Sequence, residues 1–230
     1  MKFIVIGLGY FGSKLAVNLT NQGHEVIGVD NRPDRIDELK DSISIVMEMD
    51  TTMESAVKSL PLDDTDAVVV GIGEDVGSSI LTLSILKSLN VKRLIGRAIT
   101  PRHENILMHI GIKEIVHPEA EAAFALSSML RLKNALKITE LDDDNLIVEL
   151  YVPKKYVGHT LESMNLFKRF NLRLLAVKML PDKKHDLLNL KKKKPNYVAN
   201  FDFNLQLVLK DDDVLVLAGN LKNIRQLSEE

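Results

Sequence analysis

Apolar runs and helical repeats alternate along the first half of the chain. Six short apolar runs have the length of buried strands, and stretches with apolar residues three and four positions apart fill the intervals. The expected strands are 3–6, 26–29, 43–47, 67–70, 94–95 and 115–116, and the expected helices are 14–21, 33–40, 53–59, 79–89 and 101–110. Strands that alternate with helices in this way form a parallel sheet covered by helices on both faces. We therefore expect a Rossmann-like doubly wound α/β domain.

A longer helical stretch, 119–133, follows the last of these strands, and its apolar positions cover more than one face. Such a helix commonly joins two domains or two subunits. We therefore divide the chain into an N-terminal domain, 1–134, which includes this bridging helix, and a C-terminal domain, 135–230.

The C-terminal half has a different pattern. Strands are expected at 145–152, 172–180, 205–209 and 214–217, with a helix capped by Thr160 that runs to 170 and a last amphipathic helix from about 221. The polar stretch 181–200, with its lysine run at 191–194, is expected to be a solvated loop. This order of elements predicts a small α+β domain.

Composition narrows the possible classes of protein. The chain has 230 residues and a formal net charge of −2, so its charge does not indicate nucleic acid as a partner. It contains no cysteine, which excludes disulfides, thiolate zinc sites and a thiol nucleophile. No apolar stretch approaches the roughly 20 residues that span a bilayer, and the N-terminus has no signal-peptide pattern. We therefore expect a soluble, cytoplasmic protein.

A glycine motif of the form G-x-G-x-x-G joins the first strand to the first helix. Gly7 permits a tight turn, Gly9 lets the backbone approach a phosphate, and Gly12 lets the helix pack close to the strand. The free N–H groups at the start of that helix form an anion site. Asp30 ends the second strand, where its carboxylate can accept hydrogen bonds from a ribose and repels a 2′-phosphate. The pattern predicts binding of NAD, ADP or ATP rather than NADP.

Further candidates lie where the other strands end. Asp50 and Thr51 follow the third strand beside the expected adenine, although either could instead cap the helix from 52. The glycine pair at 71–73 allows close approach to a phosphate or ribose, or forms a plain tight loop. Arg97 could pair with a phosphate, with an acid of a partner subunit, or with solvent. The full candidate set for nucleotide contact is Gly7, Gly9, Tyr10, Phe11, Gly12, Asp30, Asn31, Arg32, Asp50, Thr51, Gly71, Ile72, Gly73 and Arg97. Asn31 and Thr100 are also expected to cap the helices that follow them.

An NAD-dependent oxidoreductase is the main alternative function. Such an enzyme needs a proton donor or acceptor beside the nicotinamide. The second half offers only His159 and His185, with no paired acid in an evident motif, and the six histidines show no metal-binding spacing. A scaffold that has lost its ligand is a third reading. The residues favour a binding protein over an enzyme.

Several motifs together resemble the RCK (KTN) regulatory subunits of Trk- and Ktr-type potassium uptake systems. These motifs are 4–12, 23–26 with Asp30, Asp50-Thr51, 115–119 and 213–219. The resemblance covers nearly the whole chain. The His-Pro-Glu sequence at 117–119 and the small domain that follows it are more specific than the glycine motif, which many dehydrogenases share.

The resemblance implies a gating subunit that senses an adenine nucleotide, either NAD(H), ADP, ATP or AMP. Subunits of this family pair as homodimers and assemble into a tetramer or an octameric ring on the cytoplasmic face of a membrane-embedded potassium transporter or channel. In Ktr-type members the glutamate of the His-Pro-Glu motif helps to hold a divalent cation between paired subunits, which implies a metal role for Glu119. Some relatives bind a cyclic dinucleotide in the C-terminal domain, but no motif here decides that point.

One position departs from the family pattern. Ktr-type members that discriminate ATP from ADP have an arginine where this chain has Tyr10. A hydroxyl offers one neutral hydrogen bond in place of a charge-assisted one that is roughly twice as strong. The departure favours NAD(H), ADP or AMP over ATP, and it weakens the implied metal role of Glu119.

Overall fold

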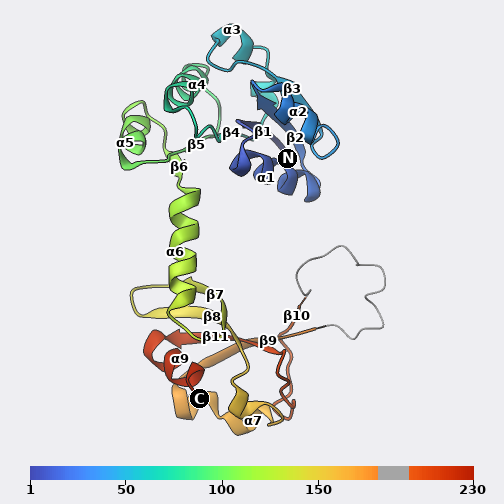
Figure 1. Cartoon of the computed structure of the whole chain (residues 1–230), viewed down its shortest axis with the longest axis vertical. Coiled ribbons are helices and arrows are strands. Elements are labelled where there is room, and N and C mark those ends of the chain that lie inside the picture. Colours follow the sequence, from blue (N-terminus) through green and yellow to red (C-terminus); the bar gives the residue numbers. More distant parts are fainter. Residues whose placement is uncertain (181–196) are drawn as a thin grey trace. The chain divides into compact units, whose positions relative to one another are not determined.

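The computed structural model describes residues 1–180 and 197–230, which form two compact units, Met1–Glu121 and Ala122–Glu230 (Figure 1). We call them unit 1 and unit 2. The boundary lies within helix α6 (Pro118–Leu130), so the predicted bridging helix begins in one unit and ends in the other. A division at 134/135 stays a prediction. In the described parts of the chain, none of the helices combines the length and the apolar character that crossing a membrane requires.

Unit 1 is built on a six-stranded parallel sheet in the order β3-β2-β1-β4-β5-β6. Its strands are β1 (Lys2–Ile6), β2 (Glu25–Asp30), β3 (Ile45–Glu48), β4 (Ala67–Val70), β5 (Leu94–Arg97) and β6 (Glu114–Val116). Its helices are α1 (Tyr10–Asn21), α2 (Pro33–Leu39), α3 (Glu54–Val57), α4 (Val76–Ser88) and α5 (Pro101–His109), with a short 3₁₀ turn at Leu62–Asp64. The chain runs outward from β1 to β3 and then crosses to β4 on the other side of β1, so the switch point of the topology lies between β1 and β4. The predicted Rossmann-like fold is confirmed.

Apolar layers cover both faces of this sheet. Val5 lies with Leu8 and Ala16 in the layer beneath α1, whereas Ile4 and Ile6 lie in the layer beneath α4 and α5. All five side chains are at most 1% exposed. Strands that are buried on both faces need nearly continuous apolar sequences, which is why β1 and β4 are recognisable as apolar runs.

Unit 2 contains a five-stranded antiparallel sheet in the order β10-β9-β11-β8-β7. Its elements are β7 (Ala135–Glu140), β8 (Asn145–Tyr151), a 3₁₀ turn (Lys154–Tyr156), α7 (Leu161–Met164), α8 (Leu166–Phe170), β9 (Arg173–Met179), β10 (Val198–Asn200), β11 (Val214–Asn220) and α9 (Leu221–Ser228). Leu150, Leu215 and Ile224 are fully buried in one apolar core formed by β8, β11 and α9. The predicted small α+β domain is confirmed.

The single helix expected from Thr160 to 170 is two short helices. Thr160 does cap α7, since its hydroxyl accepts a hydrogen bond from the N–H of Ser163 at 3.4 Å. Asn165 then takes a left-handed conformation with φ +48° and ends α7, and Asn171 ends α8 in the same way. Asparagine visits this conformation more easily than most residues, and a periodic apolar pattern does not register such a break.

The strands of unit 2 also differ from the expected ones. The apolar pattern does not predict β7, and the strand expected at 205–209 is wrong. Only Val208 forms a bridge there, to Thr160. The side chain of Asn204 accepts a hydrogen bond from the N–H of Gln206 at 2.9 Å, and the resulting turn interrupts the extended run.

The predicted loop at 181–200 is described only in part. Residues 181–196, which include His185 and the lysine run 191–194, lie outside the described residues. Val198–Asn200 form the edge strand β10, paired with β9, where a loop is predicted. Three residues of mixed polarity are too few to show a period of two.

One of the two predicted helix caps in unit 1 is wrong. Thr100 caps α5 as predicted, because its hydroxyl accepts a hydrogen bond from the N–H of His103 at 3.1 Å. Asn31 does not cap α2, whose N-terminal cap is Arg32 without a side-chain hydrogen bond. The reason is that Asp30 accepts the N–H of Arg32 at 3.0 Å and turns the chain one residue earlier.

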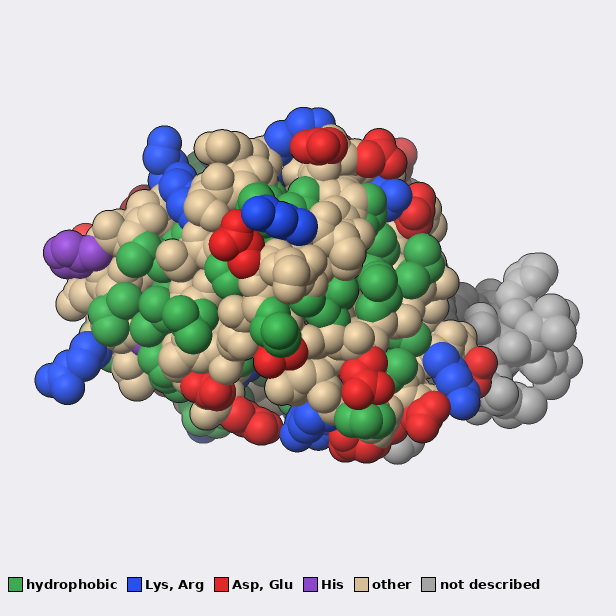
Figure 2. Space-filling model, turned by 90° about the horizontal axis from the view of Figure 1, so that it is seen from above, with side chains coloured by type: hydrophobic (Ala, Val, Ile, Leu, Met, Phe, Trp, Pro, Cys, Tyr) green, Lys and Arg blue, Asp and Glu red, His purple; other side chains and the backbone are tan. Residues whose placement is uncertain are grey.

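The face drawn in Figure 2 agrees with the small net charge. On the face drawn in Figure 2, acidic and basic side chains are interspersed among apolar ones, and neither sign of charge forms a broad area. A face that binds nucleic acid gathers basic side chains. The face in Figure 2 has no such concentration.

Candidate functional site

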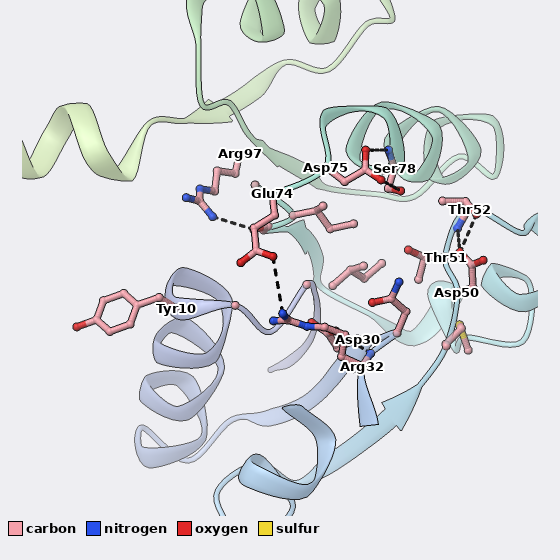
Figure 3. A pocket seen from close by; sticks show the side chains of 18 residues that line it. Tyr10, Asp30, Arg32, Asp50, Thr51, Thr52, Glu74, Asp75, Ser78 and Arg97 are labelled. Carbon is pink, nitrogen blue, oxygen red and sulfur yellow. Dashed lines mark hydrogen bonds and ion pairs between the residues drawn. The ribbon is translucent and has the colours of Figure 1, made fainter. Parts of the chain in front are cut away.

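A cavity of about 510 Å³ lies at the carboxyl ends of the parallel strands of unit 1, at the switch point between β1 and β4 (Figure 3). Residues at the ends of five strands, β1 to β5, contribute to its lining. All the candidate nucleotide-contacting residues line it except Phe11 and Gly12. Open α/β sheets bind ligands in the crevice at this position, so the cavity is the candidate site.

The three glycines of the motif meet three different steric demands. Gly7 has φ +86°, and a Cβ there would lie 2.8 Å from the backbone nitrogen of Ile72, so the tight turn requires glycine. A Cβ on Gly12 would lie 1.9 Å from the carbonyl oxygen of Gly7, so α1 can sit against β1 only without a side chain. A Cβ on Gly9 would meet no protein atom within 4 Å. Because Gly9 lines the cavity, its backbone is open to a ligand there.

The two aromatic residues after Gly9 do not point into the cavity. The Tyr10 side chain is 84% exposed and points away from the cavity in Figure 3, although the residue contributes to the lining. In this orientation its hydroxyl does not occupy the place expected for a phosphate contact. Phe11 does not line the cavity, and its ring centroid is 5.7 Å from the guanidinium carbon of Arg97. Phe11 thus supports a cavity residue rather than lining the cavity.

Asp30 is buried at the end of β2, and both of its carboxylate oxygens accept backbone hydrogen bonds. Oδ2 accepts the N–H of Leu8 at 2.6 Å, and Oδ1 accepts the N–H of Arg32 at 3.0 Å. Because each carboxylate oxygen has a second lone pair, the group can still accept a hydrogen bond from a ribose hydroxyl. Asn31 is exposed and also lines the cavity.

An ion pair links the loop after β2 to the loop after β4 at the cavity. Arg32 Nη1 lies 3.7 Å from a carboxylate oxygen of Glu74, and Arg32 Nε lies 3.7 Å from Asp30 Oδ1 (Figure 3). Glu74 is 87% exposed, so this pair is solvated and weak. The sequence analysis missed the role of Glu74, because nothing in the local pattern brings it opposite Arg32.

The residues after β3 combine a turn with a buried hydroxyl. Asp50 Oδ1 accepts hydrogen bonds from the N–H of Thr52 at 3.0 Å and from its hydroxyl at 2.7 Å, and these bonds lower the pKa of Asp50. Asp50 does not cap a helix at Thr52, since α3 begins at Glu54. Thr51 is buried and its hydroxyl shares a hydrogen bond with that of Thr82 of α4 at 2.9 Å. The pair links the turn after β3 to α4.

The loop after β4 passes directly over the glycine turn. A Cβ on Gly71 would lie 3.3 Å from the carbonyl oxygen of Gly7, and Ile72 and Gly73 continue the lining. Asp75 then caps α4, accepting the N–H of Ser78 at 3.1 Å and its hydroxyl at 2.7 Å. These bonds lower the pKa of Asp75. An aspartate just before an apolar helix is a capping signal that sequence reasoning could have used.

Arg97 occupies the rim of the cavity between β4 and the start of α6. Its Nη1 donates to the carbonyl oxygen of Gly71 at 3.1 Å, and its Nη2 forms an ion pair with Glu119. The side chain of Arg97 is 14% exposed, so solvent is not its main partner. A Cβ on Gly73 would lie 2.6 Å from Arg97 Nη1, so the glycine makes room for the guanidinium. The acid that pairs with Arg97 belongs to its own chain.

The residues of the chain by itself do not fit a metal ion at Glu119. The carboxylate is already paired with a guanidinium. Among the described residues, no group of three or more histidine, aspartate or glutamate side chains is arranged to hold a metal. A divalent cation between paired subunits stays a prediction.

No histidine of the described chain lines the cavity. His159, the residue considered for hydride-transfer chemistry, is exposed in unit 2, where its Nδ1 lies 3.3 Å from the carbonyl oxygen of Val157. The cavity offers glycine amides, carboxylates, hydroxyls and two guanidinium groups. These groups suit binding of a phosphorylated nucleoside better than proton transfer at a carbon.

The model of the TrkA-N domain family matches residues 3–118 of the chain. Two Ktr system potassium uptake proteins of Bacillus subtilis (strain 168) are similar to it. Protein C is 34% identical over 177 residues, which cover 77% of this chain and 80% of that protein. Protein A is 27% identical over 229 residues, which cover 100% of this chain and 96% of that protein. Protein A of Vibrio alginolyticus is 32% identical over 181 residues, covering 79% of this chain and 82% of the other.

Solved structures agree with the fold. The RCK domain of GsuK has a TM-score of 0.64 at 16% identity, covering 100% of this chain and 48% of the GsuK chain. At that identity the likeness shows the fold alone. The NAD(P)-binding domain of an exopolyphosphatase-related protein from Archaeoglobus fulgidus has a TM-score of 0.51 at 27% identity, covering 56% of this chain and 98% of the other. From its sequence and its relatives, the chain belongs to the TrkA-N domain family and is a homologue of the Ktr potassium uptake proteins.

Proposed function

We propose that this chain is a nucleotide-sensing regulatory subunit of a potassium uptake system and not an enzyme. The cavity of unit 1 takes an adenine nucleotide, either NAD(H), ADP, ATP or AMP. The observation that carries this proposal is the pairing, in one cavity, of the open backbone at Gly9 with the carboxylate of Asp30. The first suits a phosphate and the second a ribose.

The relatives support the transport role. The similar proteins of Bacillus subtilis and Vibrio alginolyticus carry the name of potassium uptake proteins. By that relationship the chain is a cytoplasmic protein that reaches the membrane through a membrane-embedded potassium transporter or channel subunit. It acts as a homodimer that assembles further into a tetramer or an octameric ring. A ligand can shift such an assembly only by its difference in affinity for two conformations.

Charge around the cavity bears on which nucleotide binds. Four carboxylates line it, those of Asp30, Asp50, Glu74 and Asp75, against the guanidinium groups of Arg32 and Arg97, so four negative and two positive charges leave a net charge of −2. A ligand with little net charge, such as NAD, meets less repulsion there than ATP. The domain from Archaeoglobus fulgidus that resembles unit 1 is described as NAD(P)-binding, which agrees with this order of preference.

A glycine substitution tests the proposal sharply. Gly9→Ala places a methyl group where no protein atom lies within 4 Å, so the free energy of unfolding should change by no more than about 1 kcal/mol. The same methyl group would occupy the space of a bound phosphate. We therefore expect titration calorimetry with NAD, ADP and AMP to show binding to the parent protein and at least a tenfold loss in Gly9→Ala. Asn18→Ala, on the exposed side of the same helix, is the matched control and should bind like the parent.

The readings that compete with this proposal give different results. A ligand-free scaffold would show no heat with any adenine nucleotide and no thermal shift, although a ligand at 100 times its Kd adds about 2.7 kcal/mol of stability. An oxidoreductase would oxidise or reduce NAD(H) with small alcohols or hydroxy acids, and that activity would depend on His159. Equal nucleotide affinity with and without the membrane partner would contradict gating.

A further inference from the structure

The ion pair between Arg97 and Glu119 joins the candidate site to the helix that leaves unit 1. Arg97 ends β5 and lines the cavity, and Glu119 is in the first turn of α6. Both residues belong to unit 1, and α6 continues as one helix into unit 2. Arg97 is therefore in direct contact with the first turn of this helix, and a movement of its side chain acts on that turn.

Arg97 is held in place by its surroundings more firmly than Glu119 is. The guanidinium donates to the carbonyl oxygen of Gly71, lies near the ring of Phe11 and occupies the space left by the missing side chain of Gly73. Its Nε is buried and has no acceptor among the described residues. The Glu119 side chain is 63% exposed, so its carboxylate can exchange Arg97 for water at little cost.

We infer that Arg97 transmits ligand binding to α6, because a ligand phosphate and the Glu119 carboxylate compete for its guanidinium. This inference rests on the proposed function. A phosphate of the bound nucleotide presents several acceptor oxygens to an arginine that already faces the cavity, and arginine binds phosphate in a bidentate manner. As the phosphate takes up the Arg97 donors, Glu119 is released and the first turn of α6 loses its anchor to β5.

The same geometry removes the need for a divalent cation next to Glu119. Before a ligand binds, the guanidinium of Arg97 balances the charge of Glu119. Released from Arg97, the carboxylate still lies in the first turn of a helix, where the N-terminal end of the helix dipole stabilises negative charge. Nucleotide binding should therefore be independent of divalent metal.

A pair of glutamate substitutions in the same helix turn tests the exchange. Glu119→Gln frees Arg97, so calorimetry with ADP and with NAD should show an affinity about threefold to fivefold higher than that of the parent. Glu121→Gln is the matched control. It removes the same charge from the same turn, but the only hydrogen bond of its side chain among the described residues is from the N–H of His117, at 3.5 Å. The control should bind both ligands within twofold of the parent.

Amide hydrogen exchange in α6 separates the proposed exchange of partners from a simple loss of charge, because loss of charge alone would not change how α6 responds to ligand. In the parent and in Glu121→Gln, ADP or NAD should raise the exchange rate of the amides in the first two turns of α6. In Glu119→Gln the rate should already be high and should not respond to ligand. Arg97→Gln should lose about tenfold in affinity and all of the response.

A separate titration tests the metal. The affinity of the parent protein for NAD should agree within twofold in EDTA and in Mg²⁺.

Two results would overturn the inference while leaving the proposed function intact. One is equal affinity and an equal α6 response in Glu119→Gln and Glu121→Gln. The other is NAD binding that requires Mg²⁺ in the parent and loses this requirement in Glu119→Gln. If the parent binds neither ADP nor NAD, the proposed function fails and the inference falls with it.

Discussion

The carboxylate of Asp30 accepts the backbone N–H of Leu8 at 2.6 Å, so the acid that ends β2 also fixes the glycine turn that follows β1. The same carboxylate holds the N–H of Arg32 at 3.0 Å. Asp30 is 8% exposed. One side chain therefore shapes both the glycine turn after β1 and the turn after β2 at the cavity.

Asp30→Asn should destabilise unit 1 as well as weaken nucleotide binding. The amide has only one acceptor oxygen, so its NH₂ group must face one of the two backbone N–H groups. Leaving a buried donor unsatisfied costs about 1–3 kcal/mol, and we expect urea denaturation to show a loss of that size. Asp41→Asn, at an exposed site outside the cavity lining, is the control and should stay within about 0.5 kcal/mol. Equal losses at both sites would contradict the role given to Asp30.

Gly12→Ala should damage the fold rather than the cavity surface. Its methyl group would lie 1.9 Å from the carbonyl oxygen of Gly7, which forces α1 away from β1. Strain of this kind costs about 1–3 kcal/mol or more, and thermal unfolding followed by circular dichroism measures it. Gly9→Ala is the comparison, because its methyl group meets no protein atom. A Gly12→Ala protein as stable as Gly9→Ala would contradict the close packing of α1 on β1.

Glu74→Gln should raise the affinity for anionic nucleotides. Glu74 is the partner of Arg32 at the cavity, and removing its charge both frees Arg32 and reduces repulsion. An exposed pair contributes up to about 1 kcal/mol, so calorimetry should show an increase of up to about fivefold for ADP, a larger one for ATP and a smaller one for NAD. Glu54→Gln removes an exposed charge outside the cavity lining and should have no effect. The same gain for all three ligands would count against the charge argument.

His103 should make the protein less stable in acid. It is 1% exposed, and neither ring nitrogen has a partner among the described residues, so burial lowers the pKa of His103 below its ordinary 6.5. The unfolded chain therefore binds the proton more readily. The stability that neutral His103 contributes is fully present above pH 6.5. It is lost as the pH falls toward the folded pKa, and the free energy of unfolding then decreases by at most about 1.4 kcal/mol per pH unit.

Urea denaturation between pH 7.5 and pH 5 tests this dependence. His103→Leu removes the titrating group and should flatten the pH profile relative to the parent. His109→Gln, an exposed position in the same helix, should keep the parent profile. Identical profiles for the parent and His103→Leu would rule out His103 as the cause.

The candidate site could be predicted where a single residue meets a local demand. Gly7 must adopt a positive φ, and Asp30 ends the next apolar strand in the chain. Both residues therefore stand out in the linear pattern. Asn31 shows the limit, because its expected cap is displaced by a competing turn at Asp30. In unit 2, the apolar pattern missed the break at Asn165, where the asparagine takes a left-handed conformation, and the strand β7, which depends on pairing with β8.

The amino-acid sequence alone determined the order of strands and helices in unit 1, the glycine turn and the acid that follows it, because backbone sterics and apolar periodicity act between near neighbours in the chain. Only the tertiary structure decided that Arg32 faces Glu74, that Thr51 meets Thr82 and that Arg97 holds Glu119. Those partners come from different strands, loops and helices. They meet because the carboxyl ends of parallel strands converge at one edge of the sheet, and no local pattern encodes which side chains will face each other there.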